Sequence, residues 1–236
     1  MISFIRGLLF HLGYAVSIIL YSIFVTPIAF LFPFKVRHPW IFVWTGFLGW
    51  WLKVTCNIRF EMENPEDIPE EVCVVVSNHE SSWETFFLQS YFAPQCVAAK
   101  KELFYIPFVG FTLRSLNPII IDRTKKQNAL KQLVSQGKDR LNDGVSVLIF
   151  PEGTRVDRGE TKAHFAGGSM LAIQAKCPIL PIVHNSGKFW PPNKIKKNPG
   201  VIKIRVGKKI DTAGRKPKEL TQEIEDWMRK TSKELA

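Results

Sequence analysis

The 236-residue chain is long enough for one sizeable hydrophobic core and does not require a second domain. Its 32 Lys and Arg against 21 Asp and Glu give a net charge of +11, which indicates an anionic partner: nucleic acid, acidic lipid headgroups or phosphorylated small molecules. The cysteines are scattered without a C-x-x-C pair, which argues against a zinc site and against a disulfide framework.

The first apolar segment covers residues 7–34, with no charged side chain between Arg6 and Lys35. It exceeds the roughly 20 apolar residues that cross a bilayer core, so it is predicted to be a membrane segment. A cleaved signal peptide would have a shorter apolar region and a small-residue cleavage site. Pro27 and Pro33 are expected to kink the segment, so a hairpin in one leaflet fits the sequence as well as a true span.

A tryptophan-rich stretch, residues 35–53, follows the first segment. Tryptophan favours the bilayer interface, so this stretch predicts a second, interfacial or re-entrant segment. More Lys and Arg follow the first apolar run than precede it, and this asymmetry predicts that the remaining chain lies in the cytoplasm. The membrane concerned is expected to be the cell inner membrane. The residues concerned are Trp40, Trp44, Trp50 and Trp51, and Lys35, Arg37, Lys53 and Arg59.

From Asn57 onward, β-branched runs alternate with amphipathic stretches. This pattern predicts an α/β domain with a central, mostly buried β-sheet flanked by helices. We therefore divide the chain into an N-terminal membrane-associated helical hairpin, residues 1–56, and an α/β domain, residues 57–236. Strands are expected at 57–63, 71–77, 117–123, 144–153, 177–186 and 201–210, and helices at 85–91, 128–142, 168–176 and 219–235.

Three of the predicted strands end in conspicuous polar groups. One runs into His79 and Glu84, a second into Asp122 and Arg123, and a third into the sequence from Glu152 to Arg155. Ligands of open α/β sheets gather beyond the carboxyl ends of the strands, so the three endings together predict a site.

His79 is a candidate general base, because a neutral imidazole takes up a proton near physiological pH and a carboxylate on its other nitrogen would fix the tautomer. Glu84 lies five positions later, which on one continuous helix would leave the side chains roughly 140° apart. The pair therefore requires His79 in the turn and Glu84 in the first helical turn. The alternative is structural: Ser81 and Glu84 form an S-x-x-E capping box that needs no chemistry.

The other two endings carry arginines that suit an anion. Gly153 allows a tight turn whose amides could face an anion, and guanidinium groups at Arg123 and Arg155 would form a phosphate clamp. The structural alternatives are a plain turn with a surface ion pair at 152–155 and a solvated pair of Asp122 with Arg123.

Four stretches, "NHESSWE", "PIIIDR", "FPEGTR" and "ILPIVHNS", resemble in order and spacing the four sequence blocks of the glycerolipid acyltransferase family, in its bacterial lysophosphatidate-acylating branch. The resemblance covers residues 57–209 and includes "AKKELFYIPFVGFTL", which looks like the connecting segment of the family. The first block departs from the usual pattern, since it ends in Glu84 where the family usually has Asp.

The resemblance implies a two-helix membrane motif before an acyltransferase domain. It also implies transfer of a fatty acyl group from acyl-coenzyme A or acyl-carrier protein to the sn-2 hydroxyl of 1-acyl-sn-glycerol 3-phosphate, which forms phosphatidic acid. His79 would be the general base and Glu84 would orient it. The acceptor's glycerol phosphate would be bound by Arg123, Glu152, Gly153, Thr154 and Arg155, with Lys100 or Lys101 also reaching phosphate, and "LPIVHNS" would help to shape the acyl site.

Two alternatives remain open: an acyltransferase for another lysophospholipid or lyso-aminolipid, and a noncatalytic membrane-tethered binder of lipid or nucleic acid. The chain lacks a G-x-S-x-G elbow, an H-E-x-x-H motif and a P-loop, which argues against a serine lipase, a zinc hydrolase and an NTPase. Attack of an alcohol on a thioester needs a base and an oxyanion stabiliser, so we expect no metal or cofactor. The acyl thioester is the expected co-substrate, and we expect no nucleic acid partner.

Overall fold

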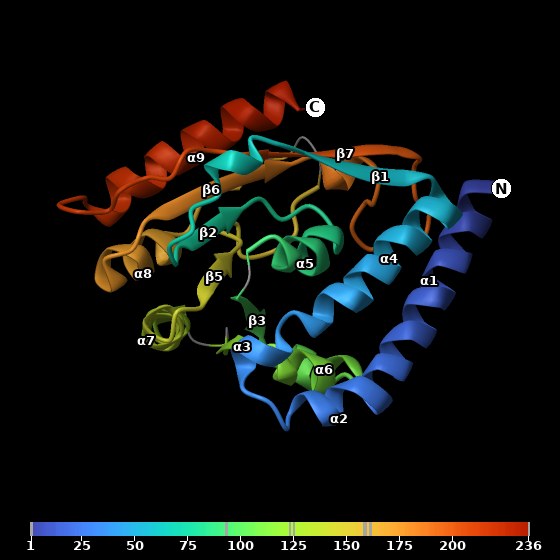
Figure 1. Cartoon of the computed structure of the whole chain (residues 1–236). Coiled ribbons are helices and arrows are strands. Elements are labelled where there is room, and N and C mark those ends of the chain that lie inside the picture. The colour runs from blue at the N-terminus through green and yellow to red at the C-terminus, as the bar shows by residue number, and fades with distance from the viewer. Residues whose placement is uncertain are drawn as a thin grey trace.

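A seven-stranded mixed β-sheet forms the centre of the computed structural model, which describes residues 2–92, 94–122, 124, 126–157, 160 and 162–235 (Figure 1). The strand order is β1-β7-β6-β2-β5-β3-β4, and only the β6–β7 pair is antiparallel. The carboxyl ends of β2, β3, β4, β5 and β6 therefore meet at one edge. The strands are β1 Ile58–Glu63, β2 Val74–Ser77, β3 Gln95–Lys100, β4 Ile119–Ile121, β5 Ser146–Ile149, β6 Ile179–His184 and β7 Gly200–Val206.

Helices cover both faces of the sheet, because successive side chains of a strand point to opposite faces and the central strands β2 and β6 are buried along their whole length. Val75 of β2 joins the core cluster on the side of α4 and α5, whereas Val74 and Val76 join the cluster on the side of α7, α8 and α9. The predicted fold class is thereby confirmed. The helices of this part are α5 Trp83–Phe87, α6 Val109–Ser115, α7 Lys126–Asn142, α8 Gly167–Ala175 and α9 Pro217–Glu234, with short 3-10 turns η2 Pro65–Asp67, η3 Leu88–Ser90, η4 Lys101–Tyr105 and η5 Ser186–Lys188.

The N-terminal segments form a helical hairpin along one side of the sheet (Figure 1). The first arm consists of α1 Ile2–Leu20, a π-helical turn η1 Tyr21–Val25 and α2 Thr26–Ala29; α3 Phe34–Arg37 and the second arm, α4 Trp40–Cys56, follow. The two arms are antiparallel, as two hydrogen bonds between them show. The indole N–H of Trp44 donates to Ser17 Oγ, and that of Trp51 donates to the carbonyl of Leu9, each at 3.2 Å.

Close approach of the two arms depends on Gly13. A Cβ atom at Gly13 would lie 2.1 Å from Trp51 Nε1, so any side chain there would push α1 away from α4. Gly7, six residues before Gly13 in the same helix, is equally constrained, since a Cβ atom there would lie 2.1 Å from the carbonyl oxygen of Ile195. The first arm is thus packed against α4 and against the loop before β7.

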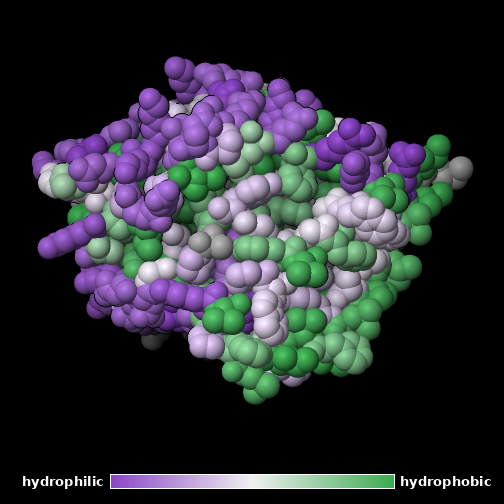
Figure 2. All heavy atoms as spheres, viewed as in Figure 1, coloured by the Kyte–Doolittle hydropathy of each residue, from purple (hydrophilic) through white to green (hydrophobic). Residues whose placement is uncertain are grey.

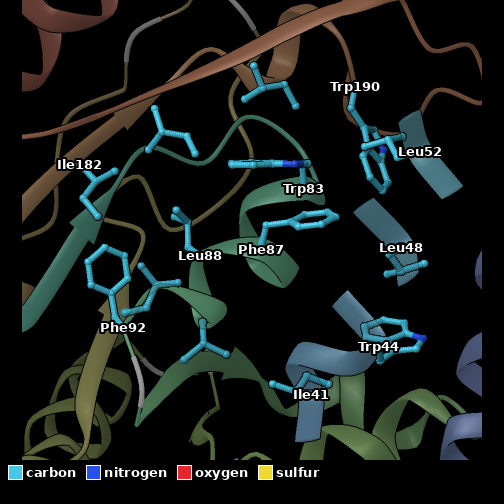
Figure 3. Close-up of a cluster of buried hydrophobic side chains, with 14 of the residues drawn as sticks. Ile41, Trp44, Leu48, Leu52, Trp83, Phe87, Leu88, Phe92, Ile182 and Trp190 are labelled. Carbon is cyan, nitrogen blue, oxygen red and sulfur yellow. The ribbon is translucent and has the colours of Figure 1, made fainter. Parts of the chain in front are cut away.

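The second arm belongs to the same core as the sheet. Ile41, Trp44, Leu48 and Leu52 of α4 face Trp83, Phe87 and Leu88 in one buried cluster (Figure 3). The prediction of an interfacial role was therefore wrong for Trp44, which is buried, whereas Trp50 is exposed. The boundary at residue 56 coincides with the end of α4, but the shared core leaves the division into two domains a prediction.

The outer face of the first arm is apolar and exposed. Residues 2–29 form one helical run long and apolar enough to cross a membrane, and 17% of its most apolar window is buried. Figure 2 shows the corresponding hydrophobic band along the right and lower edge of the molecule. Pro27 does not end the run: the π-helical turn immediately before α2 accommodates the missing N–H, and Pro33 lies outside the helix, at the N-cap of α3.

Two elements escaped the sequence prediction. Strand β3 reads "QCVAAK", which lacks the β-branched content of its neighbours, and its first residue is a polar Gln95 that is fully buried. Helix α6 follows a proline-containing turn and contains Gly110, both of which are typical of loops. The remaining strands and helices overlap the predicted ranges, with ends that differ by a few residues.

Candidate active site

His79 and Glu84 lie together at the carboxyl end of β2, the strand at the centre of the sheet. Glu84 is in the first turn of α5, and His79 lies in the turn that precedes this helix. The imidazole Nδ1 and the carboxylate oxygen Oε1 of Glu84 are 2.8 Å apart. The geometric condition set by the sequence, a histidine outside the helix and a glutamate inside its first turn, is confirmed.

The carboxylate of Glu84 is fully buried and accepts five hydrogen bonds. Oε1 accepts from His79 Nδ1 and from the amides of Glu80 and Ser81, and Oε2 accepts from the hydroxyls of Ser81 and Ser186. These bonds span 2.7–3.0 Å. Because such a carboxylate has every lone pair occupied, its orientation toward His79 is fixed by the protein rather than by solvent.

The capping box predicted at Ser81 is present in modified form. The amide of Ser81 donates to Glu84, as a capping box requires, but the Ser81 hydroxyl accepts from the amide of Trp83 and donates to Glu84. The N-cap position itself is Ser82, whose side chain makes no capping hydrogen bond. The carboxylate of Glu84 therefore both caps the helix and orients the histidine. The catalytic pair and the structural capping box, which the sequence offered as alternatives, are compatible.

The electrostatics of the pair keep His79 neutral and Glu84 ionised. Burial lowers the pKa of His79 below its ordinary 6.5, partly offset by the hydrogen bond and charge of Glu84, and Arg155 lowers it further. Burial alone would raise the pKa of Glu84, but His184, His79 and Ser81 together lower it to about 2. A carboxylate can only accept, so Nδ1 of His79 carries the proton and Nε2 offers the basic lone pair.

The loop after β5 closes over this histidine. The Phe150 ring stacks on the His79 ring, with centroids 4.1 Å apart and planes inclined by 14°. The guanidinium of Arg155 donates from Nε to the carbonyl of Ser81 at 2.9 Å, and the amide of Val156 donates to the carbonyl of His79 at 2.8 Å. The predicted neighbours His79 and Arg155 are therefore held by the same turn, with the guanidinium of Arg155 close to the imidazole.

Glu152 belongs to the same loop after β5 and is directed into the protein. Its side chain is buried, and its Oε2 atom has no hydrogen-bond partner among the described residues. Burial raises the pKa of its carboxyl to about 7; the amides of Glu152 and His79 oppose the shift, and Glu80 and Glu84 add to it. A carboxyl group in this state can exchange hydrogen bonds with a hydroxyl group, whereas a fully ionised one would repel a phosphate.

The adjoining residues of the loop are turned outward. Gly153 adopts a positive φ of 69°, a conformation that favours glycine, and Thr154 and Arg155 are exposed. The predicted group of Glu152, Gly153, Thr154 and Arg155 thus divides into a buried carboxyl and an exposed rim.

The ends of β3 and β4 carry a second pair of charges. Lys101 Nζ lies 3.7 Å from Asp122 Oδ2, and Lys100 is exposed beside it. Arg123, predicted as part of a phosphate clamp, lies outside the described residues. In the part of the chain that the structure describes, no three His, Cys, Asp or Glu side chains are grouped to hold a metal ion; the absence of a cofactor stays a prediction.

The sequence did not single out Phe150. It placed His184 and Ser186, within "LPIVHNS", at the acyl site, whereas the structure brings both to Glu84. His184 follows Ile182 and Val183 at the end of β6, and its Nε2 donates to the carbonyl of Asn78 at 2.9 Å and lies 4.0 Å from Glu84 Oε2. The "HNS" ending of β6 was the available signal, because β6 neighbours β2 and brings a histidine and a serine to the same edge of the sheet.

A cavity of about 290 Å³ lies beside this turn, next to the N-terminal hairpin. Its walls come from α1, from the start of α5 and from the loop before β7, and they are His11, Tyr14, Ser82, Phe86, Trp190, Asn193, Lys194 and Ile195. The cavity combines aromatic surface with a few polar groups, as ligand sites do, and Ser82 places it three residues from His79 in the chain.

A family model described as "Acyltransferase" matches residues 59–185, which contain the entire turn between His79 and Glu84 and the loop after β5. The chain belongs to the acyltransferase family. It is 41% identical over 239 residues to the 1-acyl-sn-glycerol-3-phosphate acyltransferase of Pseudomonas aeruginosa, an alignment that covers 98% of this chain and 92% of that protein.

More distant relatives extend the same similarity. The human 1-acyl-sn-glycerol-3-phosphate acyltransferase beta is 31% identical over 173 residues, covering 71% of this chain and 62% of the human protein. The crystal structure of the 1-acyl-sn-glycerophosphate acyltransferase of Thermotoga maritima superposes with a TM-score of 0.81 at 26% identity, covering 98% of this chain and 95% of that one. Its near-complete overlap includes the N-terminal helices as well as the sheet.

Proposed function

We propose that this acyltransferase transfers a fatty acyl group from an acyl thioester, either acyl-coenzyme A or acyl-carrier protein, to the sn-2 hydroxyl of 1-acyl-sn-glycerol 3-phosphate, forming phosphatidic acid. The observation that carries the proposal is the 2.8 Å hydrogen bond between Nδ1 of His79 and the buried carboxylate of Glu84, at the carboxyl edge of the sheet. The name of the Pseudomonas relative supports the choice of acceptor.

In the proposed reaction, Nε2 of His79 takes the proton of the acceptor hydroxyl while the hydroxyl oxygen attacks the carbonyl carbon of the thioester. The tetrahedral intermediate collapses, the carbon–sulfur bond breaks, and the imidazolium returns the proton to the thiolate. Glu84 stabilises the imidazolium through the 2.8 Å hydrogen bond, and no covalent acyl-enzyme is required. The stacked Phe150 ring limits the orientations open to the base.

The acceptor's head would lie over the loop after β5. The exposed guanidinium of Arg155, held near His79 by its bond to the Ser81 carbonyl, would bind the phosphate, together with Lys100, Lys101 and Arg123. Glu152, which presents a buried carboxyl oxygen without a partner among the described residues, would bind a glycerol hydroxyl rather than the phosphate.

We propose further that the hairpin inserts into one leaflet, at the cytoplasmic face of the inner membrane, rather than spanning the bilayer. The first arm is fixed to the body of the protein at its start and after α1: Ser3 donates to the carbonyl of Lys197, and Ser22 of η1 donates to the carbonyl of Phe108 at 3.1 Å. A spanning orientation of this helix would draw the polar surface beside it into hydrocarbon, which is costly.

An acceptor panel tests the reaction. The full chain in phospholipid vesicles is assayed with lysophosphatidate, glycerol 3-phosphate, lysophosphatidylethanolamine and a lyso-ornithine lipid, each with acyl-coenzyme A and acyl-carrier protein. We expect transfer to lysophosphatidate and its loss in His79→Ala, with an unchanged thermal unfolding midpoint. Turnover by folded His79→Ala would contradict the assignment of the base, and preference for another acceptor would replace the proposed substrate.

A further inference from the structure

A second group of exposed apolar side chains lies outside the N-terminal hairpin, in the connection between β3 and β4. We call it the 103–111 segment; it comprises the end of η4, a turn and the start of α6. Large apolar side chains that cluster on a surface indicate a contact with another apolar body. The exposed members are Leu103 (37%), Tyr105 (71%), Ile106 (45%), Phe108 (41%) and Phe111 (42%).

The backbone of this segment carries strain at the tip of its turn. Phe108 adopts φ 62° and ψ −54°, and the amide of Val109 donates to the carbonyl of Pro107 at 2.6 Å. This is a γ-turn with positive φ, a rare and strained conformation for a residue other than glycine. The chain accepts this strain while leaving the phenyl ring partly exposed, and strain of this kind is typical of functional positions.

The 103–111 segment is continuous with the apolar face of the hairpin. The rings of Phe30 and Phe111 are 5.5 Å apart, Thr26 Oγ1 and Thr112 Oγ1 are 3.3 Å apart, and Ser22 is bonded to the Phe108 carbonyl. In Figure 1, α6 lies directly beside α2, and the hydrophobic band of Figure 2 reaches this lower edge. The 103–111 segment and the outer face of the hairpin therefore form one continuous apolar surface.

Cations border the combined apolar surface. The Arg37 guanidinium lies 5.2 Å from the centre of the Phe30 ring and donates from Nε to the carbonyl of Ser115 at 2.9 Å. Arg114 lies over the Phe104 ring at 5.7 Å. Guanidinium groups at the margin of an apolar patch match the depth and the charge of anionic lipid headgroups.

We infer that the 103–111 segment is a third membrane-inserting element, which enters the same leaflet as the hairpin in a bilayer that contains anionic phospholipid. The inference rests on the membrane association proposed above. Insertion of the segment would also position two lysines. Because the segment follows the end of β3, its insertion holds Lys100 and Lys101 at the level of the lipid headgroups.

Depth-dependent quenching tests the inference. One accessible cysteine is introduced in each of three full-length variants: Tyr105→Cys, Leu12→Cys on α1 and Lys230→Cys on α9. All three also carry Cys177→Ser, because Cys177 is partly exposed, whereas the other native cysteines are buried and stay in place. Each variant carries a thiol-linked fluorophore and is bound to phosphatidylethanolamine–phosphatidylglycerol vesicles with brominated acyl chains. We expect a loss of fluorescence at position 105 similar to that at position 12, and none at position 230.

The outcomes separate the two proposals. Quenching at position 12 without quenching at position 105 would overturn the inference and leave the hairpin in the membrane, with a second copy of the chain as the remaining occupant of the segment. Quenching at neither position would overturn the membrane association itself, and the inference with it.

A charge substitution supplies a second measurement. Ile106→Asp should weaken binding to the same vesicles by about tenfold or more, whereas Ile106→Leu should not. Ala213→Asp, which adds the same charge at an exposed turn before α9, is the matched control and should leave binding unchanged. Equal binding by Ile106→Asp and Ala213→Asp would contradict the inference.

Discussion

Replacement of Glu84 by glutamine tests the role of charge in the site without removing its hydrogen bonds. The amide oxygen of Gln can accept from His79, Glu80 and Ser81, and its NH2 group can donate to the hydroxyls of Ser81 and Ser186, since a hydroxyl also accepts. The variant therefore folds, but the imidazolium formed during transfer loses its counter-charge. A charge-assisted hydrogen bond contributes about 3 kcal/mol, so we expect kcat to fall roughly 100-fold.

The assay is transfer of a labelled acyl group to vesicle-borne lysophosphatidate, with thermal unfolding measured in parallel. Glu84→Asp is the matched control: it keeps the charge, shortens the reach, and should retain most of the activity. Wild-type rates in both variants would mean that Glu84 is only a helix cap. A loss in Glu84→Gln that is accompanied by unfolding would refute the hydrogen-bond exchange described above.

Arg155→Ala should mainly raise the apparent KM for lysophosphatidate, and an unchanged acceptor dependence would remove Arg155 from the phosphate site. Burial raises the pKa of the Glu152 carboxyl from its ordinary 4.5 to about 7. Between pH 4.5 and 7 the folded protein therefore keeps this proton and the unfolded chain loses it, so the free energy of unfolding falls as pH rises through this range, by up to about 3 kcal/mol. Urea unfolding of Glu152→Gln should lack this slope, and an identical slope in both proteins would contradict the burial argument. Gly13→Ala should force α1 away from Trp51 and destabilise the hairpin by about 1–3 kcal/mol, whereas Gly46→Ala, whose Cβ would meet nothing within 4 Å, should be neutral or stabilising; equal unfolding midpoints would refute the close packing.

The local sequence predicted those features that depend on neighbouring residues. The turn at His79 and the placement of Glu84 in the first turn of α5 follow from a strand, a serine pair and a five-residue spacing. The contact of Ser186 with Glu84 could not be read locally, because 102 residues separate them and the pairing of β6 with β2 brings them together.

Burial rather than composition explains the other errors. Trp44 looks like an interfacial tryptophan in the sequence, but α4 turns it toward Phe86 and Tyr21 inside the protein. Strand β3 contains a buried Gln95 and two alanines, so neither hydrophobic periodicity nor β-propensity predicts it from the sequence. It is held as a strand by its pairing with β4 and β5.

The proposed position of the first helical arm along one leaflet has a kinetic consequence. An enzyme whose apolar helix lies along one leaflet meets a lipid acceptor by lateral diffusion, so the relevant concentration is the mole fraction of acceptor in the surface. Dilution of lysophosphatidate with inert phospholipid at constant bulk concentration should therefore slow the reaction, while dilution of the whole vesicle suspension should slow it only once the protein begins to leave the surface. Product formed in this way remains in the leaflet from which its precursor came.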